Sequence, residues 1–240
     1  MNIRLKFKQT VTAGLQTFAQ QYCLLCTAHN GSELGLCDAC VKSLPWHGAP
    51  QCPQCGLHSD GLVCGHCLSS PPDFDATHSL FTYDFPVDSM LQHYKYRDML
   101  YLSNTFATLF SQKLATKNNA NKIDLIIPMP MHSARLKERG FNQALEIARI
   151  IAKNSQIKCD FTTCQRTKLT PPQASLPLKE RIKNIRGVFS CMQKLQGLNI
   201  AIVDDVMTTG ASLNELAKTL KQAGASHVEC WVIARTLPHK

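Results

Sequence analysis

Apolar positions along the chain predict alternating strands and helices from residue 74 onward. Five segments are continuously apolar or rich in strand-forming residues and are predicted strands: 74–85, 123–127, 157–161, 200–203 and 227–234. Three segments repeat apolar residues at helical spacing and are predicted helices, the first as one or two: 87–114, 142–151 and 213–220. Strands that alternate with helices predict an α/β domain, in which helices flank a parallel sheet.

Breaks in this pattern predict three domains. Two prolines after Ser69 and Ser70 end the cysteine-rich part of the chain and mark the boundary before the α/β domain. The predicted parts are an N-terminal amphipathic segment, a cysteine-rich module and the α/β domain, with bounds of 1–22, 23–70 and 71–240. The α/β domain is in turn expected to consist of a hood and a core, at 74–115 and 122–236.

The chain of 240 residues carries a formal charge of +9, and most of the excess lies in one segment. Residues 133–186 hold twelve Lys or Arg against four acids, which is a local charge of +8. This excess suits a polyphosphate ligand or nucleic acid, or else a solvated basic surface. The stretch 165–189 overlaps this segment, and its Pro171-Pro172 pair precludes regular structure. We expect a long loop there, which is either a lid or a disordered basic insertion.

No membrane-spanning or export segment is expected. No apolar run in the chain reaches membrane-spanning length. Residues 1–22 lack both a continuous apolar core and a small-residue cleavage site, so we reject a signal peptide. Without export, the cysteines are expected to bind metal rather than form a disulfide framework.

Eight of the twelve cysteines form four Cys-x-x-Cys pairs. Two such turns supply four thiolates to one tetrahedral metal, so the spacing predicts two zinc ribbons with two structural Zn²⁺ ions. The sequential ligand sets are Cys23, Cys26, Cys37 and Cys40, then Cys52, Cys55, Cys64 and Cys67. An interleaved pairing of the four turns is the alternative. Only Lys42 is cationic between the first and last of these cysteines, which favours a structural or partner-docking role over direct nucleic-acid binding.

The strongest candidate site follows the predicted strand 200–203. Asp204 and Asp205 come where a parallel strand leaves the sheet, the usual place for a ligand crevice in an α/β fold. The next loop has small and hydroxylated side chains and a glycine that permits positive φ, which suits a backbone cradle for phosphate: Thr208, Thr209, Gly210, Ala211 and Ser212. Carboxylates repel phosphate but accept hydrogen bonds from sugar hydroxyls, so the stretch predicts a phosphoribosyl site. The alternative is a buried strand followed by a capped surface turn.

Residues 202–211 also resemble the phosphoribosyl pyrophosphate (PRPP) motif of the type I phosphoribosyltransferases. The resemblance implies the type I phosphoribosyltransferase fold, PRPP bound with Mg²⁺, and catalytic roles for Asp204 and Asp205. It implies that Met207 and the loop after it bind PRPP, and that the loop after strand 123–127 holds pyrophosphate. The residues implied in that second loop are Met129, Arg135 and Arg139, and arginine forks suit phosphate oxygens.

The order of motifs along the whole chain resembles the ComF family, including its GntX-type members. After the four Cys-x-x-Cys pairs come Lys95-Tyr96-Arg97, the segments 128–132, 135–143, 170–173 and 184–189, and the Asp-Asp-x-x-Thr-Thr-Gly loop. The resemblance implies a cytoplasmic protein with a zinc-ribbon head on a phosphoribosyltransferase domain. It also implies an association with natural transformation or DNA utilisation.

Two functions fit these features. One is a phosphoribosyltransferase that transfers the phosphoribosyl group of PRPP to an amine or base, with an acceptor pocket built from residues 80–115. The other is a non-catalytic protein that senses PRPP or binds single-stranded DNA or a competence helicase. Residues 92–97 interleave aromatic and basic side chains, which suits base stacking but equally suits a packed helix with solvated cations.

Overall fold

A computed structural model describes residues 22–48, 50–96, 99–116, 122–170 and 184–238. The chain divides into two compact units, residues 1–44 and 45–240, and each is described by itself. The division falls between the two cysteine clusters, so the second cluster shares a unit with the sheet. The predicted boundary near residue 70 stays a prediction. The predicted amphipathic segment 1–22 lies outside the described residues except for Tyr22.

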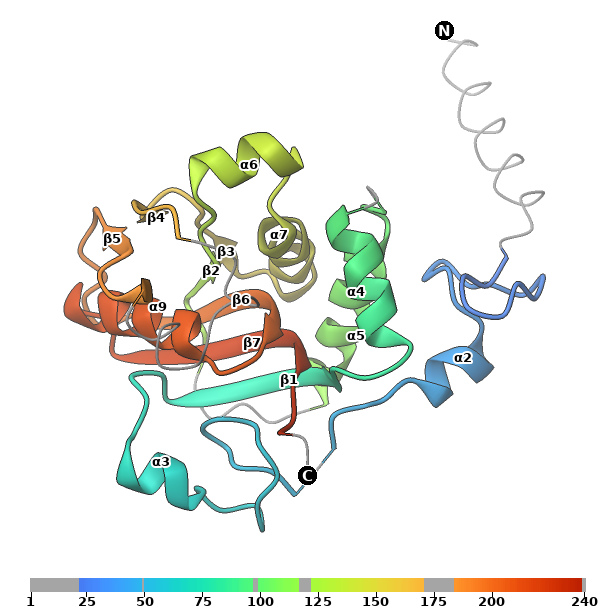
Figure 1. The fold of residues 1–240 in the computed structure, drawn as a ribbon, viewed down its shortest axis with the longest axis horizontal. Coiled ribbons are helices and arrows are strands. Elements are labelled where there is room, and N and C mark those ends of the chain that lie inside the picture. The colour runs from blue at the N-terminus through green and yellow to red at the C-terminus, as the bar shows by residue number, and fades with distance from the viewer. Residues whose placement is uncertain (1–21, 49, 97–98, 117–121, 171–183, 239–240) are drawn as a thin grey trace, which may run out of the picture. The chain divides into compact units, whose positions relative to one another are not determined.

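A five-stranded parallel sheet forms the centre of the second unit, as the strand and helix pattern predicts (Figure 1). The strand order is β1-β7-β6-β2-β3. Their bounds are Ala76–Thr82 for β1, Leu125–Pro128 for β2, Lys158–Cys159 for β3, Asn199–Met207 for β6 and His227–Arg235 for β7. Strand β6 is central and longer than predicted, so Asp204 and Asp205 lie within its last residues rather than after it.

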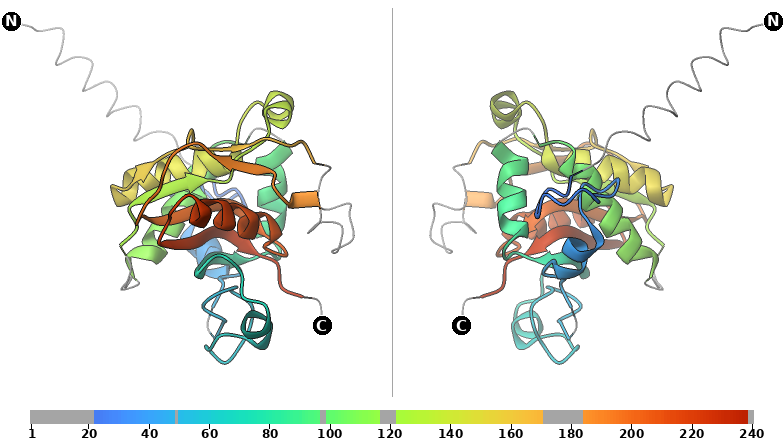
Figure 2. Two further views of the ribbon diagram at one scale, coloured as in Figure 1. Left: turned by 90° about the vertical axis from the view of Figure 1, so that its left-hand side faces the viewer. Right: turned by 90° about the vertical axis from the view of Figure 1, so that its right-hand side faces the viewer.

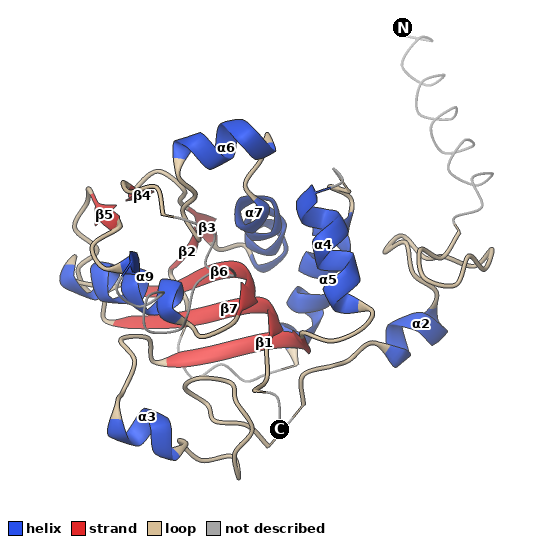
Figure 3. Ribbon diagram, in the orientation of Figure 1, coloured by secondary structure: helices blue, strands red, loops and turns tan. Residues whose placement is uncertain are grey.

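Helices cover both faces of this sheet (Figure 3). On one face α5 (Leu102–Ala115) packs beside α7 (Gln143–Ser155), and Phe110 of α5 contacts Trp231 of β7 with ring centroids 5.9 Å apart. On the other face α9 (Ala211–Gln222) buries its leucines against β7 in one apolar core. Helices α4 (Val87–Tyr96) and α5 divide the predicted helical region 87–114 in two. None of the helices in the described ranges is long and apolar enough to cross a bilayer.

The basic stretch 165–189 is less irregular than the sequence predicts. Its two ends lie in an antiparallel pair of short strands, β4 (Cys164–Arg166) and β5 (Phe189–Cys191). Cys164 and Phe189 are buried in the core that includes α9, and this apolar packing compensates for the weak strand pattern. The part of the predicted lid at 171–183 lies outside the described residues.

Two short helices accompany the cysteine clusters. Helix α2 (Asp38–Ser43) belongs to the first unit, and α3 (Gly65–Ser69) belongs to the second. The second cluster is attached to strand β1, as Figure 2 shows for the segment that carries α3. The Thr77 N–H donates to Pro53 O at 3.0 Å, and Thr77 Oγ1 donates to Gln54 O at 2.6 Å. These contacts place a cysteine turn against an edge of the sheet.

Candidate functional site

Two adjacent carboxylates form the centre of the candidate site. Strand β6 runs between β7 and β2, and Asp204 pairs in register with Val232 of β7. The Asp205 N–H donates to Asp204 Oδ1 at 2.9 Å. Burial, and then the neighbouring charge of Asp205, raise the pKa of Asp204 to about 7. A cation or a hydrogen-bond donor bound next to Asp204 would therefore favour its ionised form.

Helix α4 supplies a cation to this pair. Lys95 Nζ lies 3.0 Å from Asp205 Oδ2, and the two side chains are 23% and 13% exposed. Burial alone would lower the pKa of Lys95, but the attraction of Asp205 and Asp204 raises it. Tyr94, the preceding residue, is buried and donates from its hydroxyl to Gln143 O at 3.0 Å. The packed-helix interpretation of residues 92–97 holds for Tyr94, whereas Lys95 pairs with a site carboxylate, which the sequence did not indicate.

The loop after β6 leads directly into helix α9. Gly210 precedes the first residue of that helix and has φ of +80°, as the sequence predicts for a glycine in a tight backbone turn. A Cβ at this position would lie 2.7 Å from Met207 Cε. The Ala211 N–H donates to Thr209 Oγ1 at 3.3 Å, and Thr208 and Thr209 are exposed. A helix N-terminus and two exposed threonines thus follow directly after the strand that carries the acids, which suits an anion.

Two arginines from different elements converge on Thr170. Arg135, on α6 (Ser133–Arg139), donates from Nη2 to Thr170 O at 2.9 Å, and Arg166 of β4 donates from Nη2 to Thr170 Oγ1 at 2.5 Å. Burial and the repulsion of Arg135 lower the pKa of Arg166, while the charge of Asp204 raises it. Arg166 Nε is buried and has no hydrogen-bond partner among the described residues. Two close guanidinium groups with an unused donor suit a bound polyanion.

Arg166 was not singled out from the sequence, where it was one of twelve basic residues in a segment of high charge. Its place opposite Phe189 on the β4–β5 pair brings it to the site, and the Arg166 guanidinium carbon lies 5.7 Å from the Phe189 ring centroid. That pairing depends on residues more than twenty positions apart, so local pattern does not reveal it.

The other two predicted pyrophosphate residues occupy different surroundings. The Met129 N–H donates to Val203 O at 2.8 Å, which places Met129 next to the end of β6. The Met129 carbonyl accepts from Asn142 Nδ2 at 3.1 Å. Arg139 directs Nη1 to Gln143 Oε1 at 3.4 Å, toward the start of α7. The structure therefore brings Met129 next to the strand that carries the acids and Arg135 close to Arg166, whose pKa Asp204 raises, and it places Arg139 in contact with Gln143.

The eight paired cysteines form two groups of four, and the grouping is sequential. Within each group all sulfur atoms lie within 4.8 Å of one another. Cys26 Sγ and Cys37 Sγ are 3.7 Å apart, and so are Cys55 Sγ and Cys64 Sγ. Four sulfurs at about 2.3 Å from a tetrahedral Zn²⁺ stand about 3.8 Å from each other. The two groups are thus consistent with two structural zinc ions, one in each unit.

Comparison with known proteins adds to this geometry. A family model described as a double zinc ribbon domain matches residues 15–68. The DNA utilization protein YhgH of Salmonella typhi is 31% identical over 211 residues, which cover 86% of this chain and 92% of that protein. Competence protein F of Haemophilus influenzae is 28% identical over 230 residues, with 92% and 100% covered.

A solved structure of glutamine PRPP amidotransferase from B. subtilis, complexed with ADP and GMP, also overlaps part of the chain. The overlap has a TM-score of 0.35 at 19% identity and covers 54% of this chain and 25% of that one.

Proposed function

We propose, from the premise that this chain belongs to the ComF family together with YhgH and competence protein F, that it binds PRPP and transfers the phosphoribosyl group to an amine or base. One observation carries the proposal. Asp204 and Asp205 lie at the carboxyl end of a central parallel strand, and a Gly210-centred turn into α9 follows directly. The two carboxylates can accept hydrogen bonds from the ribose hydroxyls, and the neighbouring helix N-terminus can bind the 5′-phosphate. Together they match the two parts of a ribose 5-phosphate.

Each part of the donor has a partner in this arrangement. The ribose hydroxyls would donate to Asp204 and Asp205. The 5′-phosphate would accept from the loop that contains five of the predicted residues: Thr208, Thr209, Gly210, Ala211 and Ser212. The pyrophosphate would lie toward Met129, Arg135 and Arg166, where the unused Arg166 Nε offers a donor. Arg139 is proposed as a further pyrophosphate contact, for which its side chain must leave Gln143.

Catalysis by this site would rest on positioning and charge. The acceptor nitrogen forms a bond to C1 of the ribose, the bond from C1 to the pyrophosphate oxygen breaks, and the electron pair leaves with pyrophosphate. The carboxylates would stabilise the positive charge that develops on the sugar, and the arginines would stabilise the leaving group. Mg²⁺ bound with PRPP would supply charge neutralisation between ribose and pyrophosphate, and the oxygen atoms of Asp204 and Asp205 fit its preference for hard ligands.

Lys95 has a defined place in this proposal. Its ammonium group lies 3.0 Å from Asp205 Oδ2, so a ribose hydroxyl of PRPP would have to displace or share that contact. We assign to Lys95 the role of orienting Asp205 and of lowering the pKa of Asp204 before the donor binds. Because α4 brings Lys95 over the acids, residues of this helix would also line the acceptor pocket.

The cellular role proposed here follows the names of the relatives. YhgH is named a DNA utilization protein and its Haemophilus relative a competence protein. We propose that this chain acts in the cytoplasm in the use or uptake of DNA, and that single-stranded DNA or a helicase is its partner.

Calorimetry with PRPP and Mg²⁺ tests the site. The wild-type chain should bind, and Asp204→Asn with Asp205→Asn should abolish binding. Replacement of the exposed Asp60 by Asn removes a similar charge elsewhere in the same unit and should leave affinity unchanged. Equal binding by wild type and the double variant would end the assignment. Release of pyrophosphate in the presence of amines, bases or single-stranded DNA then tests transfer, and binding without release would favour the PRPP-sensing alternative.

A further inference from the structure

Arg235 connects the second cysteine cluster to the candidate phosphate loop. It is the last residue of β7 and is 3% exposed. Its Nε donates to Cys55 O at 2.9 Å, which is the carbonyl of a predicted zinc ligand. Its Nη1 donates to Met207 O and Thr236 O, each at 3.0 Å, and also contacts Thr208 O. One guanidinium group therefore binds both a metal-binding turn and the first residues of the loop.

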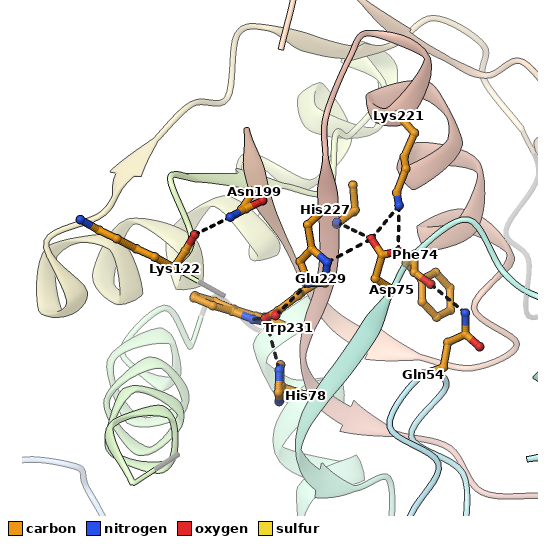
Figure 4. Close-up of polar contacts among 11 residues, drawn as sticks. Gln54, Phe74, Asp75, His78, Lys122, Asn199, Lys221, His227, Glu229 and Trp231 are labelled. Atoms are coloured by element: carbon orange, nitrogen blue, oxygen red, sulfur yellow. Dashed lines mark hydrogen bonds and ion pairs between the residues drawn. The ribbon is translucent and has the colours of Figure 1, made fainter. Parts of the chain in front are cut away.

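A second set of contacts joins the same two regions. Gln54 lies between two cysteines of the cluster, and its Nε2 donates to Phe74 O at 3.3 Å (Figure 4). The Phe74 ring in turn lies close to Gly210 of the loop, since a Cβ on Gly210 would lie 3.8 Å from Phe74 Cζ. Phe74 and Met207 are both buried in the core that includes α9. The turn at 52–55 is thus connected to the loop through two side chains, Arg235 and Phe74.

The charge of Arg235 also suits a position next to a zinc-loaded second site. None of the ion pairs between residues that the structure describes includes Arg235, although the side chain is buried. Backbone carbonyls are its hydrogen-bond partners. Four thiolates around one Zn²⁺ carry a net charge of −2, so a loaded second site would place an anion next to this cation.

We propose that Arg235 is a positioning residue that couples metal binding at the Cys52–Cys67 site to the conformation of the loop at 207–212. With metal bound, the Cys55 carbonyl is fixed and Arg235 holds the Met207 and Thr208 carbonyls in place. Without metal, the turn at 52–55 loosens, and the loop loses a support that lies outside the sheet. The second zinc site then belongs to the candidate PRPP site as a structural support.

A purely structural role for Arg235 predicts a different result. Loss of any buried hydrogen-bonded arginine lowers overall stability, and this would loosen many parts of the unit together. Coupling predicts instead that the effects of metal loss and of an Arg235 substitution on the loop are not additive, because both act through the same contact.

Hydrogen exchange on the full chain measures this coupling without any ligand. The probes are the backbone amides of residues 207–214, and the amides of α7 serve as an internal control. Arg235→Lys keeps the charge but cannot reach both carbonyl sets, so loop exchange should rise about tenfold while two zinc ions are retained. Cys52→Ser with Cys55→Ser should raise it similarly, whereas Cys23→Ser with Cys26→Ser in the other unit should not.

The combined variant is decisive. Arg235→Lys added to the Cys52 and Cys55 substitutions should raise loop exchange no further than either change alone. Additive effects, or equal effects of the two cysteine pairs, would overturn the coupling. If the cysteine variant unfolds, seen as loss of protection in α7, then Arg235→Lys with zinc retained carries the test, and unchanged loop exchange refutes the proposal.

A consequence for PRPP rests on the proposed function. Arg235→Lys should weaken PRPP binding about tenfold, since the loop must then be ordered by the ligand itself. Failure of the wild type to bind PRPP would refute the proposed function and leave the exchange result standing. Normal PRPP binding with no change of loop exchange would refute the coupling alone.

Discussion

Asp204 combines a functional role with a cost to the fold. Its folded-state pKa is raised to about 7, so the folded protein holds a proton that the unfolded chain has already lost. Stability is therefore lost as pH rises from the ordinary range of an aspartate toward 7. Asp204→Asn removes this cost and keeps an oxygen for the Asp205 N–H. We expect it to stabilise the protein by about 1–3 kcal/mol at pH 8 while it abolishes PRPP binding.

Urea unfolding of both proteins at pH 5, 6, 7 and 8 checks this. The difference between variant and wild type should grow with pH, and Asp60→Asn should show no such trend. If Asp204→Asn instead destabilises the protein at pH 8, neighbouring groups in the folded protein offset the cost of burying the ionised Asp204 carboxylate.

Lys95 should influence the pH at which Asp204 becomes ionised and available to a ligand. Its charge lowers the pKa of Asp204, opposing burial and Asp205. Lys95→Met should therefore raise that pKa further, and the pH midpoint of PRPP binding should move upward by about one unit. Calorimetry between pH 6 and 9 measures the midpoint, and the titration of PRPP itself is common to all variants. Lys153→Met, on an exposed part of α7, is the charge-matched control. An unchanged midpoint would remove Lys95 from the site.

At the scale of elements, the turn from β6 into α9 depends on Gly210. An alanine there must adopt φ near +80° and push Met207 Cε away. Gly197 has φ of +75° in the same unit, and a Cβ there would meet nothing within 4 Å. Each alanine variant should lose about 1 kcal/mol of stability through the left-handed backbone. Only Gly210→Ala should also weaken PRPP binding, as thermal melting and calorimetry would measure. Equal affinities of the two variants would argue against a phosphate cradle.

A buried polar network holds the other end of the sheet together (Figure 4). Glu229 of β7 accepts from Trp231 Nε1 at 3.0 Å, and its carboxylate lies 3.2 Å from His78 Nε2 and 3.1 Å from His227 Nε2. Burial alone would raise the pKa of Glu229, but hydrogen bonds from His78 and Trp231 and the charge of His78 lower it to about 2. The network extends to α9, because Asp75 pairs with both His227 and Lys221.

Glu229→Gln tests how much this network stabilises. A lowered pKa contributes stability that is present above the unfolded-state value and is lost as pH falls toward 2. At pH 7 the variant should therefore be less stable by about 3 kcal/mol, and the gap should close as pH falls below 4.5. Chemical denaturation of both proteins from pH 7 to pH 3 measures the gap. Protonation of zinc-ligand thiolates affects both proteins alike, so the difference isolates Glu229. A gap that is independent of pH would refute the account.

Elements with a strong local pattern of apolar residues could be predicted from the sequence, and elements without one could not. Strands β6 and β7 and helix α9 were predicted because their apolar runs and leucine spacing are long enough to be read locally. Helix α6 was not, because it is short, has no buried residue and is held by His132 at one end and Gly140 at the other. The β4–β5 pair was missed because its strands meet only across a long insertion, and burial of Cys164 and Phe189 stabilises them.

At the scale of the whole molecule, the fold class is confirmed as α/β with a parallel sheet flanked by helices and a cysteine-rich N-terminal part. The acids, the loop and the cysteine sets could be predicted because each lies in one short stretch of chain. The contacts of Lys95, Arg166 and Arg235 could not be predicted, because each reaches its partners from a distant element. Their importance follows from tertiary contacts, and composition indicates only that the region around residues 133–186 is basic.

The last prediction concerns which Cys-x-x-Cys turns bind the same zinc ion. Sequential grouping closes short loops and costs less chain entropy than interleaving. Cys23→Ser with Cys37→Ser then damages one site, and the protein should keep one zinc per chain after dialysis against a moderate chelator. Cys23→Ser with Cys52→Ser damages both and should keep none, since each site needs four thiolates for structural binding. Interleaved turns would reverse this order. Elemental analysis of zinc against protein, with two per chain for the wild type, decides between them.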